Sequence, residues 1–157
     1  MLLDLVNGRI LGTWLSLGYQ NCTTHLVWNE VSQTGQRERV QPFIDSGLIQ
    51  LRDIAAGAWP EISAFSTEVG VSVPDGSVWL LARTEGAILL TGDSTLRKAA
   101  QASDVEVRGV LWVLDELVHA SRLRPANAVE ALGLIRDGGA FLPQDECDKR
   151  IAKWMGA

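Results

Sequence analysis

Residues 73–100, VPDGSVWLLARTEGAILLTGDSTLRKAA, contain the clearest structural signals in the chain. Ser72, directly before them, is a preferred helix N-cap residue, Pro74 suits the first helical turn, and Asp75 lies three residues after the cap. This pattern predicts a helix that runs to about Glu85 and stops at Gly86.

The same stretch continues with a strand and a second helix. Residues 87–91, AILLT, form a continuous apolar run, which is typical of a strand buried on both faces of a sheet. Gly92 and Asp93 then turn the chain into a helix predicted over residues 95–102. Helix, strand and helix in this order indicate crossover connections between parallel strands.

Outward from this stretch, short strands keep alternating with helices. Helices are predicted over residues 2–17, 25–33, 37–45, 57–68, 110–120, 127–136 and 144–154, and strands over 19–24, 48–54 and 105–107. The alternation predicts the α/β class, as a three-layer α/β/α sandwich with a parallel sheet. A length of 157 residues fits one domain spanning 1–157.

Composition excludes several classes of protein. The chain is 46% hydrophobic with a formal net charge of −5, so a nucleic-acid partner would need a local basic patch. Two cysteines and two histidines argue against a disulfide framework and a multi-histidine zinc site. No apolar run is long enough for a membrane span and no signal peptide begins the chain, so the expected compartment is the cytoplasm.

Asp93 is the first candidate functional residue, because it follows the strand most suited to the centre of the sheet. Ligand sites of open α/β sheets lie beyond the carboxyl ends of their strands. Aspartate is also a preferred N-cap, so Asp93 could simply cap the next helix, a role that Ser94 could fill equally well. The spacing alone favours the cap.

Asp75 and Glu30 have similar pairs of interpretations. Asp75 is the acidic partner expected in a capping box with Ser72, yet its spacing also places it on the inward side of its helix. Glu30 lies within the apolar stripe of LVWNEV, where an ionised carboxylate would need a cation or a donor network. The plainer alternative is a Glu30 carboxylate that reaches water at the edge of the stripe. Asp115 has a related pattern but ranks below these three.

Three acids without a histidine cluster suit a hard divalent cation, Mg²⁺ or Mn²⁺. Other chemistries lack their motifs: the chain contains neither a phosphate-binding loop nor a nucleophile elbow. Most of the six tryptophans are expected in the core or at a subunit interface, with Trp28 and Trp154 as the better surface candidates.

Residues 73–118 resemble the PIN domain (PilT N-terminus) family of ribonucleases. The resemblance rests on VPDGSVWLLARTEGAILLTGDSTLRKAA, on DVEVRGVLWVLDELV and, more weakly, on LVWNEV, and in element order it covers nearly the whole chain. The family's acidic cluster falls on Glu30, Asp75 and Asp93, which the residue patterns had already singled out.

The resemblance implies cleavage of RNA that depends on Mg²⁺ or Mn²⁺, with all three acids as metal ligands and catalytic residues. Arg97 and Lys98 could then steer the RNA backbone, although solvated helix charges are the simpler interpretation of both. The family also implies frequent homodimers and a toxin role in a toxin–antitoxin pair with a small antitoxin protein.

The amino terminus departs from the family. PIN domains begin with an apolar strand that ends in an acidic motif, whereas MLLDLVNG resembles the helix that follows this strand. We therefore expect the first strand and its aspartate to lie upstream of Met1 or to be missing; the alternative makes Asp4 the first acid after a strand of three residues. The loss of that acid motivates a second hypothesis, a catalytically impaired PIN-like domain that acts as a dimer or protein-binding module.

Overall fold

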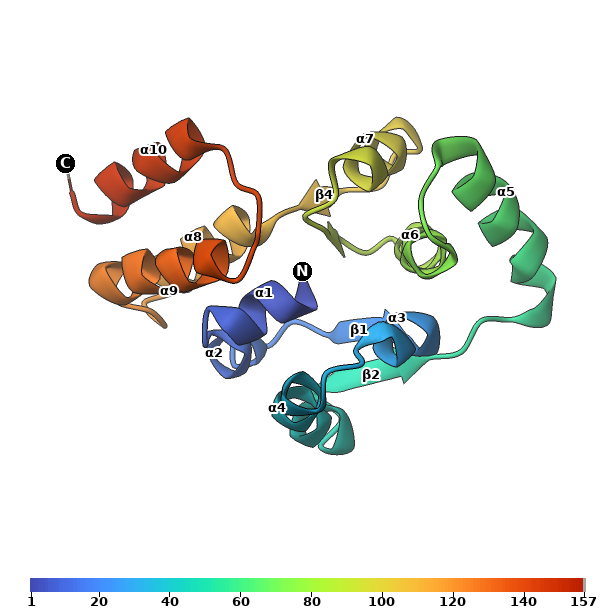
Figure 1. The fold of residues 1–157 in the computed structure, drawn as a ribbon, viewed down its shortest axis with the longest axis horizontal. Coiled ribbons are helices and arrows are strands. Elements are labelled where there is room, and N and C mark those ends of the chain that lie inside the picture. The colour runs from blue at the N-terminus through green and yellow to red at the C-terminus, as the bar shows by residue number, and fades with distance from the viewer. Residues whose placement is uncertain (157) are drawn as a thin grey trace. The chain divides into compact units, whose positions relative to one another are not determined.

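The structure, a computed structural model, describes residues 1–156. The chain divides into two compact units: a terminal unit of Met1–Tyr19 with Gly109–Ala157, and a central unit of Gln20–Arg108. Figure 1 shows the elements of both units coloured along the chain. All five site residues suggested by the sequence, Glu30, Asp75, Asp93, Arg97 and Lys98, lie in the central unit.

The central unit alternates strands and helices. In chain order its elements are β1 (Asn21–Thr24), α3 (His25–Glu30), α4 (Thr34–Asp45), β2 (Ile49–Arg52), the 3-10 helix η1 (Ala56–Ala58), α5 (Trp59–Val69), α6 (Val73–Glu85), β3 (Leu89–Leu90), α7 (Ser94–Ala102) and β4 (Val107–Arg108). This order agrees with the alternation that the sequence predicts.

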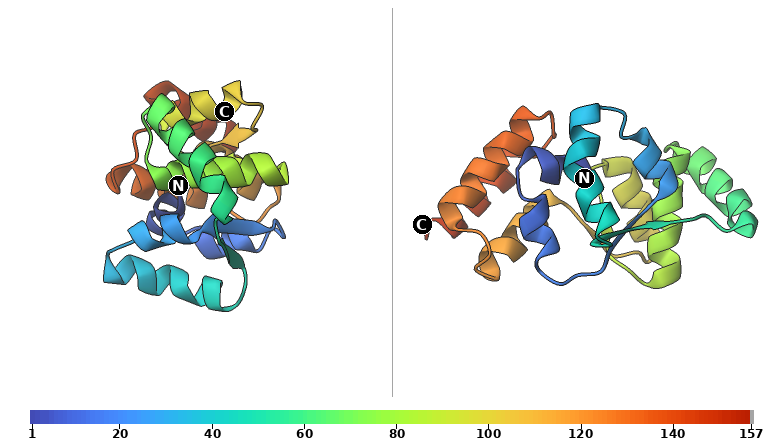
Figure 2. Two further views of the ribbon diagram at one scale, coloured as in Figure 1. Left: turned by 90° about the vertical axis from the view of Figure 1, so that its right-hand side faces the viewer. Right: turned by 90° about the horizontal axis from the view of Figure 1, so that it is seen from below.

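The strands of the described residues form two parallel pairs. β1 pairs with β2, with Asn21 opposite Ile49, and β3 pairs with β4, with Leu89 opposite Val107. Figure 2 gives two further views of these pairs and the surrounding helices. The predicted α/β class with parallel strands is thus confirmed. Instead of the single sheet that was expected, the described strands form two sheets of two strands each.

Helix α6 is the packing centre of the central unit. It packs against β1 and β3, one strand from each pair, and against the helices α3, α5 and α7. Trp79 of α6 stacks on Phe65 of α5 with ring centroids 3.7 Å apart, and its indole N–H donates to the Ser103 hydroxyl. Because α6 contacts both strand pairs, it holds the central unit together.

The terminal unit is helical. It contains α1 (Leu2–Asn7), α2 (Leu11–Leu15), α8 (Val110–His119), α9 (Pro125–Asp137) and α10 (Gln144–Trp154). The expected single helix over residues 2–17 is wrong, because Arg9 adopts a left-handed φ of 57° after Gly8 and breaks the helix in two. None of the helices within residues 1–156 is long and apolar enough to cross a bilayer.

Two other elements are shorter than expected. The helix predicted over 25–33 ends at Glu30, because Val31 turns extended and the Arg37 guanidinium donates to the carbonyls of Trp28 and Val31. The strand predicted over 87–91 is reduced to Leu89–Leu90, and the Ile88 side chain is 37% exposed rather than buried.

Candidate active site

Asp93 is an exposed N-cap of α7. Its Oδ1 accepts a 2.7 Å hydrogen bond from the backbone N–H of Leu96, and its own N–H donates to the Thr91 hydroxyl at 3.1 Å. The capping interpretation is therefore confirmed for one carboxylate oxygen. Because an N-cap uses a single oxygen, the second oxygen, Oδ2, is available to another partner.

Asp75 has the corresponding place on α6, in its first turn. The Ser72 side chain is the N-cap, accepting from the Asp75 N–H at 3.1 Å and donating its proton to Asp75 Oδ2 at 2.9 Å. The Asp75 carboxylate is half-buried and, as in Asp93, the capping contact engages one of its two oxygens. Both aspartates lie at the positive ends of helix dipoles, where a carboxylate is stabilised.

Glu30 is the last residue of α3, and its side chain is exposed. The expectation that an ionised Glu30 is buried in an apolar stripe and needs compensation is wrong, because α3 ends at this residue. Helical periodicity beyond position 30 therefore no longer determines where the side chain lies. The plainer alternative, a carboxylate that reaches water at the edge of the stripe, is the one observed.

Helix α6, which carries Asp75, packs against the helices associated with the other two acids, Glu30 and Asp93. Helix α6 packs against both α3 and α7, which lie on its two sides in Figure 1. The side chains are less close than the helices: within residues 1–156, no three His, Cys, Asp or Glu side chains are grouped so that they could hold a metal ion. The protein thus brings the three elements together without forming a three-residue ligand cage.

Two buried hydroxyls connect α3 to α6. Thr24 Oγ1 and Ser77 Oγ lie 2.7 Å apart, and both residues are completely buried. The sequence patterns did not predict this pair. Thr24 precedes HLVWNE in an N-cap position, which was a usable signal, but nothing in the sequence indicates that Ser77 is its partner.

The two basic candidates on α7 have different surroundings. The Arg97 guanidinium is half-buried and donates to the Thr91 carbonyl at 3.0 Å, whereas Lys98 is exposed. Arg97 thereby fixes the loop between β3 and α7 and has further N–H donors for an anion. Lys98 has the solvated position that the simpler interpretation predicted.

Burial raises the pKa of the Cys22 thiol on β1, and the Glu85 carboxylate raises it further while Arg52 opposes the rise. A thiol with a raised pKa is mostly protonated at neutral pH and is a poor nucleophile. Cys22 therefore lacks the lowered pKa that activates a catalytic cysteine.

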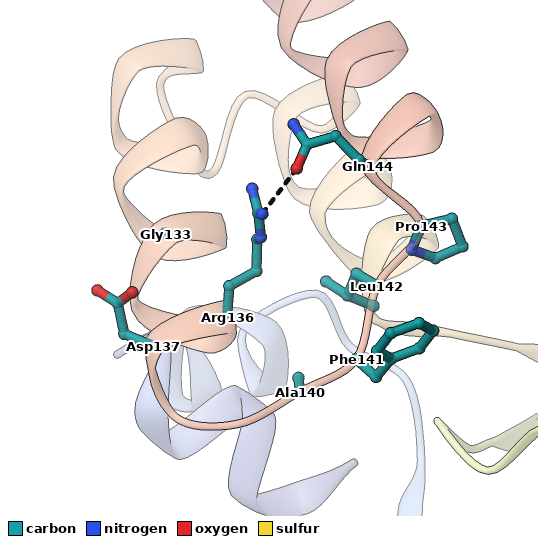
Figure 3. A pocket seen from close by; sticks show the side chains of 8 residues that line it. All are labelled: Gly133, Arg136, Asp137, Ala140, Phe141, Leu142, Pro143 and Gln144. Carbon is teal, nitrogen blue, oxygen red and sulfur yellow. Dashed lines mark hydrogen bonds between the residues drawn. The ribbon is translucent and has the colours of Figure 1, made fainter.

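The terminal unit contains a pocket whose lining residues are distant in the sequence from these acids. The pocket has a volume of about 570 Å³ and is lined by residues 133, 136, 137 and 140–144. Figure 3 shows Arg136 donating to the Gln144 side-chain carbonyl across it, at 2.7 Å, while Phe141 lies on the connecting loop. The Phe141 side chain is 94% exposed. None of the predicted site residues lines this cavity.

The chain matches the sequence model of the family DUF3368, described as a PIN domain, over residues 1–155. It therefore belongs to this family of PIN domains. No curated protein and no solved structure matches the chain. Because PIN domains are generally nucleases, membership supports a ribonuclease-type hydrolytic function.

Proposed function

We propose that the protein is a ribonuclease that hydrolyses RNA phosphodiester bonds with the help of Mg²⁺ or Mn²⁺. Asp93, Asp75 and Glu30 are its metal-binding and catalytic residues in this proposal. The supporting observation is that α6 packs against α3 and α7 in a PIN domain, which brings the elements associated with all three acids together.

The donor set fits a hard cation by its chemistry. Carboxylate and hydroxyl oxygens suit Mg²⁺ and Mn²⁺, and Mg²⁺ uses few carboxylates when waters and substrate phosphate complete its shell. Asp93 Oδ2 and Asp75 Oδ1 are the oxygens that capping leaves available. A bound divalent ion supplies charge neutralisation at the scissile phosphate and a more acidic bound water.

The chain's own residues hold the substrate. Arg97 and Lys98 are adjacent on α7, close behind Asp93, and provide the local positive charge that a chain of net charge −5 needs to attract RNA. Ser94, next to Asp93, is exposed and presents a hydroxyl that can hydrogen-bond a phosphate oxygen or a water, whereas the buried Thr91 hydroxyl supports Asp93 by accepting from its backbone N–H. Glu30, exposed at the end of α3, is suited to orient the attacking water.

The biological setting belongs to the same proposal. The protein acts in the cytoplasm as the toxin of a toxin–antitoxin pair, forms a homodimer and is inhibited by a small antitoxin protein. Both compact units then belong to one PIN-like domain over residues 1–157.

An RNA cleavage assay tests the enzymatic part. Purified protein is incubated with end-labelled single-stranded RNA in Mg²⁺, in Mn²⁺ and in excess chelator, next to the variants Asp93→Asn, Asp75→Asn and Glu30→Gln. We expect cleavage that the chelator abolishes and that each variant reduces at least tenfold. Cleavage that persists in chelator, or in all three variants, would refute the metal-dependent mechanism.

The second candidate is a catalytically impaired PIN-like module that works through protein contacts. The specific observation in its favour is that residues 1–156 contain no three-residue acidic grouping able to hold a metal ion. It predicts no cleavage above that of the Asp93→Asn protein in the same assay. Titration calorimetry with Mn²⁺ then separates the candidates further, because the impaired module releases no binding heat.

A further inference from the structure

Thr24 and Ser77 are separated by 53 positions in the chain, yet their hydroxyl oxygens form a 2.7 Å hydrogen bond in the interior of the central unit. Both residues have an exposed fraction of 0%. A buried polar pair of this kind costs free energy unless its donors and acceptors are satisfied. Its neighbours show how this is achieved.

The number of hydroxyl protons determines which of Thr24 and Ser77 donates the hydrogen bond between them. A serine hydroxyl has one proton, and that of Ser77 is donated to the Pro74 carbonyl at 2.6 Å. The proton in the 2.7 Å contact must therefore come from Thr24, whose oxygen in turn accepts from the Val27 N–H at 3.3 Å. The result is a series of hydrogen bonds that runs from the Val27 N–H in the first turn of α3, through the Thr24 and Ser77 hydroxyls, to the Pro74 carbonyl in the first turn of α6.

This series of hydrogen bonds connects the two helices that carry Glu30 and Asp75. Thr24 is the N-cap of α3, which ends at Glu30, and the Pro74 carbonyl and Ser77 flank Asp75 on α6. Helix α3 has six residues, too few to be stable without tertiary support. Its place relative to α6 therefore depends on contacts such as this one.

We infer that Thr24 and Ser77 are positioning residues, which set the location of the Glu30 carboxylate relative to the Asp75 carboxylate. The inference rests on the proposed function, because it concerns the same acids, and it adds a specific pair that orients them. Removal of a partner that hydrogen-bonds a metal ligand directly typically changes metal affinity or activity by about 10- to 100-fold, and a pair that acts through the helices carrying the ligands should fall at the lower end of this range.

The test compares three variants with a matched control. Thr24→Val keeps the shape and removes the hydroxyl, Thr24→Ser restores the hydroxyl, and Ser77→Ala breaks the series of hydrogen bonds from the other side in case Thr24→Val does not fold. Ser103→Ala is the control, because it removes another hydroxyl hydrogen bond of α6, the 2.8 Å bond from the Trp79 indole. Denaturant unfolding, Mn²⁺ titration calorimetry and RNA cleavage are measured for each.

We expect Thr24→Val and Ser77→Ala to lower Mn²⁺ affinity and kcat about tenfold at equal folded fraction, with KM for RNA nearly unchanged. Thr24→Ser should recover both quantities to within about twofold, and Ser103→Ala should lose stability without losing Mn²⁺ affinity. In the wild-type background, the effects of Glu30→Gln and Asp75→Asn on Mn²⁺ affinity should not add up in the double variant. In the Thr24→Val background, where the two carboxylates are no longer held relative to each other, the same two effects should be additive.

Two failures are distinguishable. A wild-type protein that neither binds Mn²⁺ nor cleaves RNA overturns the proposed function, and the inference with it. A wild-type protein that does both, while folded Thr24→Val or Ser77→Ala behaves like Ser103→Ala, overturns the positioning role alone and leaves the proposed function in place.

Discussion

Asp93 and Leu96 are joined by a 2.7 Å hydrogen bond from the Leu96 backbone N–H to Asp93 Oδ1. The bond satisfies one of the free N–H groups at the start of α7 and leaves Oδ2 for another partner. A structural role and a ligand role therefore use different oxygens of the same carboxylate, and substitutions can separate them.

Asp93→Asn should separate the two roles. Asparagine caps helices about as well as aspartate, so we expect the free energy of unfolding to change by about 0.5 kcal/mol or less. Removal of the negative charge should reduce metal-dependent RNA cleavage at least tenfold. Urea denaturation and the cleavage assay measure the two effects. Full cleavage by the asparagine variant would exclude Asp93 as a ligand.

Asp93→Ala is the comparison that removes both roles. It should lose cleavage as Asp93→Asn does and also lower the free energy of unfolding by about 1 kcal/mol, the usual cost of a lost N-cap. If both variants are equally stable, the bond to Leu96 contributes nothing measurable.

Ser72 offers the converse test, because it caps α6 without carrying charge. Ser72→Ala removes the acceptor of the Asp75 N–H and the donor to Asp75 Oδ2, so the free energy of unfolding should fall by about 1 kcal/mol. The Asp75 carboxylate remains, so cleavage per folded molecule should stay within about twofold. A tenfold loss of cleavage would mean that the Ser72 bond orients Asp75 for function.

The capping roles of Asp75 and Asp93 could be predicted from the sequence because they depend on local spacing. Ser72 lies three residues before Asp75, and Asp93 lies between a strand and a helix, so the local chain already defines both geometries. Whether their remaining oxygens approach Glu30 depends on how α3 and α6 pack. That packing includes the Thr24–Ser77 contact across 53 positions, which no local pattern contains.

The tryptophans show the same limit. Trp28 and Trp154 were expected at the surface, but they are 5% and 7% exposed, so this expectation is wrong. Each is buried against a charged partner that lies far along the chain or on another element. Arg37 stacks 4.3 Å from the Trp28 ring, and Asp115 accepts the Trp154 indole proton at 2.8 Å. Single-helix periodicity carries no information about such partners.

The contacts of Asp115 predict that it contributes to the stability of the fold and not to RNA cleavage. Its carboxylate accepts from the Trp154 indole and lies 3.3 Å from Arg150 Nε, which ties α8 to α10. Asp115→Ala leaves the buried Trp154 indole N–H without its acceptor and removes the ion pair with the Arg150 guanidinium, so the free energy of unfolding should fall by about 1–3 kcal/mol. Thermal and urea unfolding measure this loss.

RNA cleavage provides the contrast for Asp115. Cleavage per folded molecule should be unchanged in Asp115→Ala, and Asp115→Asn, which keeps an acceptor oxygen for the indole, should lose less stability than the alanine variant. A large loss of cleavage in the folded asparagine variant would place Asp115 among the functional acids instead.

The raised pKa of the Cys22 thiol predicts that the free energy of unfolding depends on pH. Burial and the Glu85 carboxylate raise its pKa, so the folded protein favours the neutral thiol more than the unfolded chain does. The associated stability is fully present below the unfolded-state pKa and is lost as the pH rises through the folded-state pKa. The free energy of unfolding should therefore fall over this alkaline range in the wild type, and fall less in Cys22→Ser.

Alkylation by iodoacetamide measures the same raised pKa directly, in a Cys147→Ala background where Cys22 is the remaining cysteine. Because the thiolate is the nucleophile, the rate should be slow at neutral pH and should keep increasing beyond the pH at which an ordinary thiol reaches its plateau. Glu85→Gln should shift the profile to lower pH, since it removes a charge that raises the pKa, and Arg52→Gln should shift it to higher pH. A profile that both substitutions leave in place would show that burial alone sets the reactivity of this thiol.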